Sequence, residues 1–467
     1  MRLVPNNILL WVALLAVVPA VTLIVYDDGF LGWAGAVVLA VVVLLTTLDA
    51  LFSRKRLDPV SIEVPELIRG SKGRELVVPI TLKNVGPELS EVRYGISISQ
   101  YFRIEGEVVG SVKPLGEQKL ASVNYAMIPL KRGQYVLDTL HLETRSILGF
   151  WLVRQGHKFE TEVRVYPDLT VERKRLSSIF LMRGNEGSHI VRQVGKGRDF
   201  EQLREYQPGD DYVDIDWKAT ARRQMPVTRT YQIERTQEVY VIVDHSRLSG
   251  REIRVPVDEA TEGDWLYRES AAGGDYLITS QLEKFLHCSL ILASVAEKQG
   301  DLFGFVSFSD KVTQFIRGRN GKEHYNLVRD SLYTLESRQV APDFEQLMID
   351  LRQRLTRRAL IVMLVDLSDP LTAEHFFEAL PLINKQHLVL VNMVRPERAY
   401  PMFSPGTEPE ELSVVYDNVA GHLQWQELRE TGNRLHHLGV ELGIPEHEEL
   451  CTETVTQYLN VKKRQLL

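Results

Sequence analysis

Acidic side chains follow two of the most apolar segments of the chain, where they could take part in chemistry. Asp244 ends the segment VYVIVD and Asp366 follows ALIVMLV, and both segments read as buried strands. In an open α/β sheet the ligand crevice lies outside the carboxyl ends of the strands. With Asp343, these acids make a metal-dependent hydrolase or transferase admissible. An enzyme would also need a general base beside the metal, and His245 is the one histidine that the sequence places there. One candidate is little support for the enzyme hypothesis.

The most distinctive stretch is REYQPGDDYVDIDWKATARRQMPVTRTYQIE, residues 204–234. Its Pro-Gly-Asp-Asp run, residues 208–211, predicts a turn, and its acids and arginines could form an interleaved charge network. The network would comprise Arg204, Asp210, Asp216, Arg222, Arg223 and Arg229. Because ion-pair networks imitate functional sites, we interpret this stretch as a structural clamp rather than a catalytic centre.

Sequence signals for an enzyme or a nucleic-acid binder are weak. The stretches GKGRD from Gly195 and GRNGKE from Gly318 lack the earlier Gly and the following Ser or Thr of a phosphate-binding loop. No Gly-x-Ser-x-Gly elbow or zinc-protease histidine pair occurs. The net charge of -7 opposes a nucleic-acid partner. Cys288 and Cys451 lie far apart in the sequence and predict neither a disulfide framework nor a zinc site.

The first 56 residues predict a transmembrane hairpin. Uncharged apolar runs span about residues 8–26 and 30–48, each of roughly the length that crosses a bilayer. Arg2 precedes the first run, Arg54–Arg56 follow the second, and the turn between them carries only acids. By the positive-inside rule both termini should be cytoplasmic, in a multi-pass protein of the bacterial inner membrane.

Three further regions follow from the periodicity of the chain. Short alternating segments predict an Ig-like antiparallel β-sandwich over 57–170, and residues 171–238 read as a linker. Strand and helix patterns then alternate over 239–400, which predicts an open α/β sheet. Residues 401–467 predict a helical extension. The segment 247–276 has no clear secondary structure, so partner recognition and flexibility are equally good readings of it.

The motif of residues 204–222 resembles the core of the bacterial domain-of-unknown-function 58 family. The matching positions are Arg204, Tyr206, Gly209, Asp210, Asp216, Trp217 and Arg222. The resemblance implies a membrane hairpin, then a β-sandwich, then a von Willebrand factor A-like (Rossmann-like) α/β domain. It also implies a partner, a MoxR-type AAA+ ATPase, with a role in the assembly or maturation of other proteins.

The same resemblance implies a site for Mg²⁺, although the motif is incomplete. A von Willebrand A domain often holds the ion with an Asp-x-Ser-x-Ser loop, a Thr and a late Asp, which are hard oxygen ligands. Here Asp244 and Ser246 match, but the third loop position is Leu248. Asp343 stands in the region of the Thr, and Asp366 is the late acid. We expect a degenerate Mg²⁺ site at these residues, and otherwise no cofactor.

Taken together, the sequence predicts a membrane-tethered, non-enzymatic scaffold with a cytoplasmic interaction domain. The lipid bilayer and the ATPase are its expected partners. Two alternatives remain: a metal-dependent enzyme at the strand-end acids, and an envelope structural protein whose large part lies outside the cytoplasm.

Overall fold

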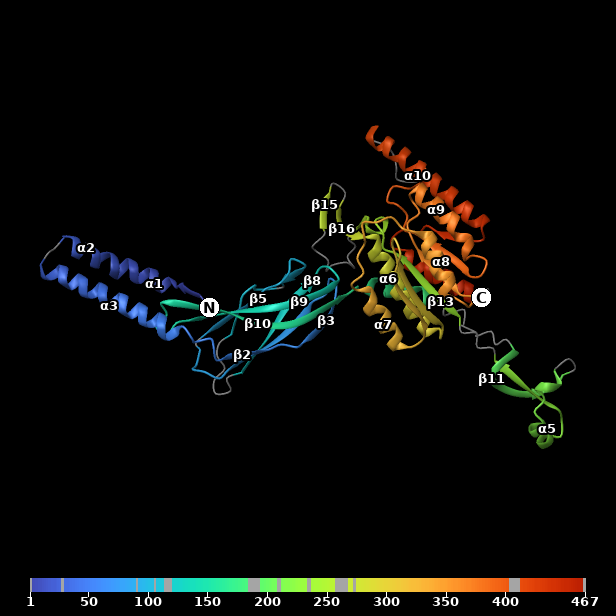
Figure 1. Ribbon diagram of the computed structural model, residues 1–467, viewed down its shortest axis with the longest axis horizontal. Coiled ribbons are helices and arrows are strands. Elements are labelled where there is room, and N and C mark those ends of the chain that lie inside the picture. The colour runs from blue at the N-terminus through green and yellow to red at the C-terminus, as the bar shows by residue number, and fades with distance from the viewer. Residues whose placement is uncertain are drawn as a thin grey trace. The chain divides into compact units, whose positions relative to one another are not determined.

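The structure, a computed structural model, divides into two compact units, and Figure 1 labels many of their elements. The first unit comprises Met1–Asp168 with Val257–Arg268, and the second comprises Leu169–Pro256 with Glu269–Leu467. The structure describes residues 2–26, 29–89, 91–104, 106–112, 120–183, 194–207, 211–232, 237–256, 268–271, 274–402 and 412–464.

Two apolar helical segments open the first unit, and both are long and apolar enough to cross a membrane. The first runs through α1 (Asn7–Val12), the wider π-helical turn Ala13–Val17 and α2 (Val18–Tyr26). Pro19 accounts for the wider turn, because proline lacks the N–H that a regular α-helix bonds at this point. The second segment is α3 (Phe30–Ser53), which continues past the expected end at Leu48.

The two helices approach closely at Gly35 of α3. A Cβ built on Gly35 would lie 2.7 Å from the carbonyl oxygen of Ala20, so a larger side chain has no room there. Small residues at such contacts are typical of helix pairs in membranes, where close backbone packing replaces the hydrophobic driving force. The hairpin is therefore a packed pair rather than two independent helices.

Two β-sheets of the first unit pack around one apolar core that includes Ile80, Leu140 and Val163. Alternating residues of the strands face this core, as the period-2 pattern predicted. Strand β3 runs parallel to β10, which the prediction of a wholly antiparallel sandwich missed. The larger sheet has the order β1 (Arg2–Pro5), β10 (Trp151–Tyr166), β9 (Gly133–Arg145), β5 (Val92–Ile96), β7 (Gly110–Val112), with β3 (Leu67–Ser71) also on β10. The smaller has the order β2 (Val60–Glu63), β4 (Leu76–Asn84), β8 (Leu120–Pro129), β6 (Phe102–Ile104).

The second unit is built on an open six-stranded sheet that is parallel except at one edge. Its central strands are continuous apolar runs and are buried along their length, as expected for parallel strands covered on both faces. The order is β18 (Val312–Arg319), β17 (Leu302–Phe308), β13 (Glu238–Asp244), β19 (Leu360–Leu364), β20 (Leu388–Asn392), β21 (Glu441–Gly443). Strand β18 is the antiparallel one.

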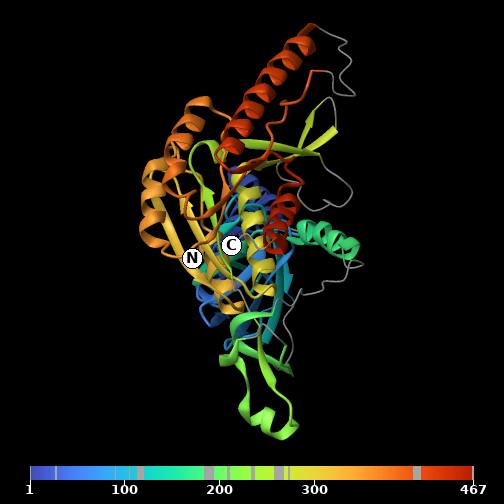
Figure 2. The same cartoon turned by 90° about the vertical axis from the view of Figure 1, so that its right-hand side faces the viewer.

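Helices cover both faces of this sheet (Figure 2). Neighbouring residues of β13 point to opposite faces, so Val241 joins the core under α6 and α11 while Ile242 joins the core under α8 and α9. The helices are α6 (Gln281–Lys298), α7 (Lys322–Leu332), α8 (Phe344–Arg354), α9 (Pro370–Ala379), α10 (Leu412–His437) and α11 (Leu450–Arg464), and Leu380–Leu382 continues α9 as a 3-10 turn.

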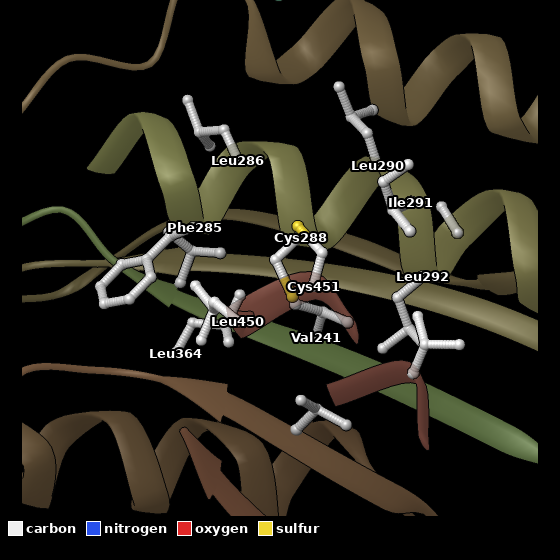
Figure 3. Packing of buried hydrophobic residues seen from close by; sticks show 14 of the residues in the cluster. Val241, Phe285, Leu286, Cys288, Leu290, Ile291, Leu292, Leu364, Leu450 and Cys451 are labelled. Carbon is white, nitrogen blue, oxygen red and sulfur yellow. The ribbon is translucent and has the colours of Figure 1, made fainter. Parts of the chain in front are cut away.

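Cys288 of α6 and Cys451 of α11 meet inside the first of these cores (Figure 3). Both thiols are free and buried. A hydrogen bond with Cys288, together with burial, raises the pKa of the Cys451 thiol well above its usual range. Residues far apart in the sequence thus serve here as small apolar side chains of one core.

Parts of the predicted linker and of the predicted helical extension belong to the core of the α/β unit. Helix α4 (Thr170–Arg183), in the expected linker, buries Leu176 in the core of α6. Strand β21 and helix α11, in the expected helical extension, complete the sheet and its cover. The described part of the segment 247–276 is not an irregular loop. It forms a 3-10 turn (Leu248–Gly250) and a three-stranded sheet of order β14 (Glu252–Pro256), β16 (Gly274–Ser280), β15 (Arg268–Ala271).

Candidate functional site

Asp244 lies at the carboxyl end of β13, fully buried beneath the loop that follows. Its two carboxylate oxygens accept hydrogen bonds from Ser246, one from the backbone N–H at 2.7 Å and one from the hydroxyl at 2.9 Å. Burial raises the pKa of Asp244 to about 7, the two bonds from Ser246 oppose that rise, and the charge of Asp366 adds to it. Asp244 therefore carries a proton at a much higher pH than an exposed aspartate does.

Asp366 follows the neighbouring strand β19 and is also buried. The Arg251 guanidinium donates to its Oδ2 at 3.4 Å and to the Ser368 hydroxyl at 2.7 Å. The other carboxylate oxygen accepts from the Ser368 backbone N–H at 2.9 Å. A cation supplied by the chain itself thus faces the acid that was expected to help hold a metal ion. Arg251 gave no signal in the sequence, because it lies far from Asp366 along the chain.

Two other expected site residues have structural partners. Asp343 is exposed and caps α8, accepting from the backbone N–H of Gln346 at 2.9 Å. His245 is buried, and its ring nitrogens lie 3.1 Å from the Glu336 carbonyl oxygen and 2.9 Å from the Thr313 hydroxyl. Since burial also lowers the pKa of His245, this histidine is poorly placed to act as a general base toward a substrate.

The strand-end residues fit a divalent cation poorly. Leu248, which replaces a hydroxyl ligand, points into the protein with 4% of its surface exposed. The Ser246 hydroxyl already donates to Asp244. Across the described residues, no three His, Cys, Asp or Glu side chains lie close enough together to hold a metal ion. The arrangement favours an internal guanidinium over bound Mg²⁺, and the sequence-based Mg²⁺ site stays a prediction.

The motif around Asp216 forms a separate small element, which we call the core-motif lobe. It consists of β11 (Val194–Glu205) paired with β12 (Val227–Gln232), the 3-10 turn Tyr212–Asp214 and the short helix α5 (Trp217–Arg223). Asp216 caps α5 by accepting from the N–H groups of Lys218 and Ala219, both at 3.0 Å. Arg229 of β12 donates to the same carboxylate at 2.9 Å. These bonds, that from Ala219 foremost, lower the pKa of Asp216 and fix α5 on the strand pair.

Of the charge network expected from the sequence, the hydrogen bonds above join Asp216 and Arg229. Arg204 lies on β11 and donates to the carbonyl oxygen of Glu205, and the Tyr206 ring lies 5.9 Å from that of Tyr212. Arg222 lies in the last turn of α5. Gly209 and Asp210 of the motif fall outside the described residues.

The core-motif lobe exposes large side chains that the charge pattern did not reveal. Tyr212 is 73% exposed, Val213 87% and Trp217 68%. The basic residues Lys218 and Arg222 of α5 are exposed beside them in the sequence. Tyr, Trp and Arg are the side chains most enriched in protein interfaces.

Comparison with known proteins agrees with the motif. The family model described as "Protein of unknown function DUF58" matches residues 202–252 and 246–402, which run from the core-motif lobe through most of the α/β sheet. Fold and motif together define a protein with two apolar N-terminal helices and an α/β unit. Residues 202–402 of this chain are therefore similar to the DUF58 family.

More distant similarities are weaker. The uncharacterized protein YeaD of Bacillus subtilis (strain 168) is 25% identical over 125 residues, which is 26% of this chain and 31% of that protein. An aerotolerance-related membrane protein from Bacteroides fragilis shares 14% identity with a TM-score of 0.26, covering 48% of this chain and 98% of its own. BatB of Bacteroides thetaiotaomicron shares 13% with a TM-score of 0.27, covering 49% and 99%. Scores this low do not assign a fold, which rests here on the strand order.

Proposed function

We propose that this protein is a non-enzymatic scaffold of the bacterial inner membrane that captures a protein partner in the cytoplasm. The observation that carries the proposal is the exposure of Tyr212, Val213 and Trp217 on the core-motif lobe. Exposed apolar side chains that gather in one place mark interaction sites, and Trp and Tyr dominate binding energies at interfaces. The capped helix and the paired strands hold these residues in place before a partner arrives, which lowers the ordering cost of binding.

The partner that we propose is a MoxR-type AAA+ ATPase. The family resemblance implies it, and the sequence carries no phosphate-binding loop of its own. The exposed basic groups of α5 suit an acidic surface on that ATPase. In this arrangement the ATPase does the mechanical work, and this protein determines where in the cell the work is done.

The strand ends of the α/β unit form the second face of the proposed scaffold, in a von Willebrand A-like layout. Here the Arg251 and Asp366 pair takes the place of the metal ion that such domains often present. Arg251 is half-exposed and can bind a carboxylate from a partner, as a bound cation would. Catalysis is not part of the proposal, since His245 is buried and fully hydrogen-bonded.

The membrane topology supports the same function. Strand β1 precedes the first apolar helix and pairs with β10, while β2 follows the second helix and belongs to the same unit. Both ends of the hairpin therefore lie on the side of the β-sandwich. The basic residues at those ends favour the cytoplasmic side.

Co-purification of the full-length protein from native membranes in mild detergent tests the proposal. Wild type should retain a AAA+ ATPase identified by mass spectrometry, and Trp217→Ala should lose most of it, at least tenfold if the side chain is a binding hot spot worth about 2 kcal/mol. Tyr416→Ala is the matched control, because Tyr416 of α10 is equally exposed at 69%. Absence of an ATPase from the wild-type preparation, or equal retention by both variants, would contradict the proposed docking site.

A further inference from the structure

Asp49 is an acidic residue buried near the end of the second apolar helix. It lies within α3 with 3% of its surface exposed, one turn before Ser53, which is fully buried. A carboxylate at such a position is costly unless hydrogen bonds replace its water. The partners of Asp49 therefore identify what this end of the helix is built to hold.

Those partners belong to the turn that joins β9 to β10, residues 146–150. The Asp49 carboxylate accepts from the Ser146 hydroxyl at 2.6 Å, from the Leu148 N–H at 2.9 Å and from the Phe150 N–H at 3.3 Å. The Ser53 hydroxyl donates to the same carboxylate at 3.3 Å and accepts from the Ile147 N–H at 3.0 Å. One helix end thus accepts from three backbone N–H groups of the turn, those of Ile147, Leu148 and Phe150.

Further bonds extend this contact along the helix and to the N-terminus. The Trp151 indole N–H donates to the Thr46 carbonyl oxygen at 2.9 Å. The contacts from Thr46 to Ser53 therefore follow α3 over about 10 Å of its axis. On the other side, the Asn6 side chain donates to the Gly149 carbonyl oxygen at 2.8 Å, just before α1 begins. The turn is held at the base of the hairpin, between the start of one helix and the end of the other.

The tip of this turn exposes apolar side chains at that level. Ile147 is 61% exposed and Leu148 is 51% exposed, although their backbone N–H groups are bound to α3. On the adjoining end of the helix, Leu51 and Phe52 are exposed as well. An exposed apolar tip that continues the apolar surface of a membrane helix suits the acyl region just beneath the lipid headgroups.

Basic residues surround the tip and match the chemistry of a membrane surface. Arg54 and Lys55 follow α3 and are exposed, and Arg145 immediately precedes the turn. Arg56 donates to the Arg145 carbonyl oxygen at 2.9 Å, which fixes the start of the turn to the segment after α3. Cations placed beside an apolar tip bind phosphate headgroups while the tip enters the lipid.

We propose that the turn 146–150 is a third membrane-contacting element, which inserts Ile147 and Leu148 into the bilayer interface and is locked there by Asp49. The inference rests on the proposed membrane insertion of the hairpin. Its consequence is that the β-sandwich is fixed to the membrane by its own turn instead of swinging on the segment after α3.

The test uses the full-length protein in lipid nanodiscs, with a single environment-sensitive fluorophore (NBD) on an introduced cysteine. The variants are Ile147→Cys at the tip, Val41→Cys in the middle of α3, and Val136→Cys on β9, the strand that leads into the turn, but remote from it. All three positions are exposed to the surroundings, whereas the native thiols are buried. Lipids carrying a nitroxide quencher on the acyl chain report contact with the bilayer.

We expect strong quenching and a blue-shifted emission at positions 147 and 41, and a water-like emission without quenching at 136. Asp49→Asn in the Ile147→Cys background should abolish most of the quenching at 147, because the amide nitrogen that replaces one carboxylate oxygen cannot accept a hydrogen bond from the turn. Quenching at 41 without quenching at 147 would overturn the inference and leave the hairpin inserted. Absence of quenching at 41 as well would overturn the insertion of the hairpin itself. Quenching at 147 that Asp49→Asn leaves intact would overturn the role of Asp49 as the lock.

Discussion

At the scale of single residues, Asp244 combines complete burial with hydrogen bonds that come from Ser246. Its pKa of about 7 lies above the ordinary value of 3.8 that it regains on unfolding. The folded protein therefore binds the proton more tightly than the unfolded chain does. The resulting stability is fully present below pH 3.8 and is lost as the pH rises through about 7.

Asp244→Asn should remove this loss of stability. The amide has nearly the same shape, and its oxygen can still accept from the Ser246 N–H. We expect the variant to unfold at a higher temperature than wild type at pH 8, and the difference to shrink as the pH is lowered to 5. The difference in unfolding free energy between the variant and wild type changes by up to about 1.4 kcal/mol per pH unit. Circular dichroism melts of the full-length protein in detergent at several pH values provide the measurement.

Asp369→Asn is the control with the opposite sign. Hydrogen bonds from Thr372 hold the pKa of Asp369 below its usual range, so its carboxylate stabilises the fold above its ordinary pKa. At pH 8 this variant should therefore not unfold at a higher temperature than wild type. An Asp244→Asn variant that is less stable than wild type at pH 8 would show that the Asp244 charge is compensated, for example by a bound cation.

The paired thiols allow a second prediction at this scale. Because Cys288 and Cys451 are buried and the pKa of Cys451 is raised, the folded protein should contain almost no reactive thiolate. Ellman's reagent should therefore release no colour from the native protein and two equivalents after denaturation in guanidinium. Rapid reaction of either thiol in the native protein would contradict the packing of α6 against α11.

The sequence predicted Asp244 and Asp366 at one edge of a sheet because long apolar runs show where buried strands end. It could not predict Arg251 beside Asp366, since a single arginine in a polar segment has no periodicity. The sequence likewise predicted that the second membrane helix ends just before Asp49, because a charged residue interrupts the apolar run there. In the structure the distant turn 146–150 and the Ser53 hydroxyl supply the hydrogen bonds of Asp49, and α3 continues to Ser53.

At the scale of elements, the long apolar strands and the amphipathic helix α6 follow directly from the pattern of the sequence. The short strands do not. The segment Glu441–Gly443 has little strand propensity of its own and is extended because β20 offers it a free edge. Strand β14 likewise depends on its antiparallel partner β16, within a segment that is polar overall. Periodicity in the sequence cannot predict elements that are stabilised by a neighbouring strand and not by their own residues.

Gly304 of β17 is a further case in which a neighbour dictates the residue. A Cβ there would lie 2.2 Å from the ring of Tyr240, which is buried on β13 and whose hydroxyl accepts from the Gly318 N–H at 3.1 Å. Gly304→Ala should therefore destabilise the sheet by about 1 to 3 kcal/mol, the usual range for overpacking a core. Chemical denaturation followed by circular dichroism measures the loss.

Gly318→Ala on the adjacent strand β18 is the matched control, because its Cβ would meet the Tyr240 hydroxyl only at 3.4 Å. It should cost clearly less. Combining Gly304→Ala with Tyr240→Leu should recover part of the lost stability, since the smaller side chain frees the space. Equal effects of the two alanine variants would show that β13 and β17 are not packed as described.

At the scale of the whole molecule, the two units divide the work of a tethered scaffold. The first unit combines the apolar hairpin with a β-sandwich that holds both of its ends. The second carries the DUF58 region, the core-motif lobe and the strand-end face. In the proposed function a partner binds both faces, so that the first contact raises the local concentration for the second and two weak contacts act together.

The side of the membrane on which these faces lie is the last prediction. Arg2 and Arg54–Arg56 flank the hairpin, and residues 27–29 between its helices comprise two acids and no base. We therefore expect alkaline phosphatase, which is active only in the periplasm, to be inactive when fused after Leu467 and active when inserted after Asp28. A green fluorescent protein fusion, which is fluorescent only in the cytoplasm, should give the opposite result at the two sites. Active phosphatase at the C-terminus would place the second unit outside the cytoplasm, where a cytoplasmic ATPase cannot reach it, and would favour a structural role in the envelope.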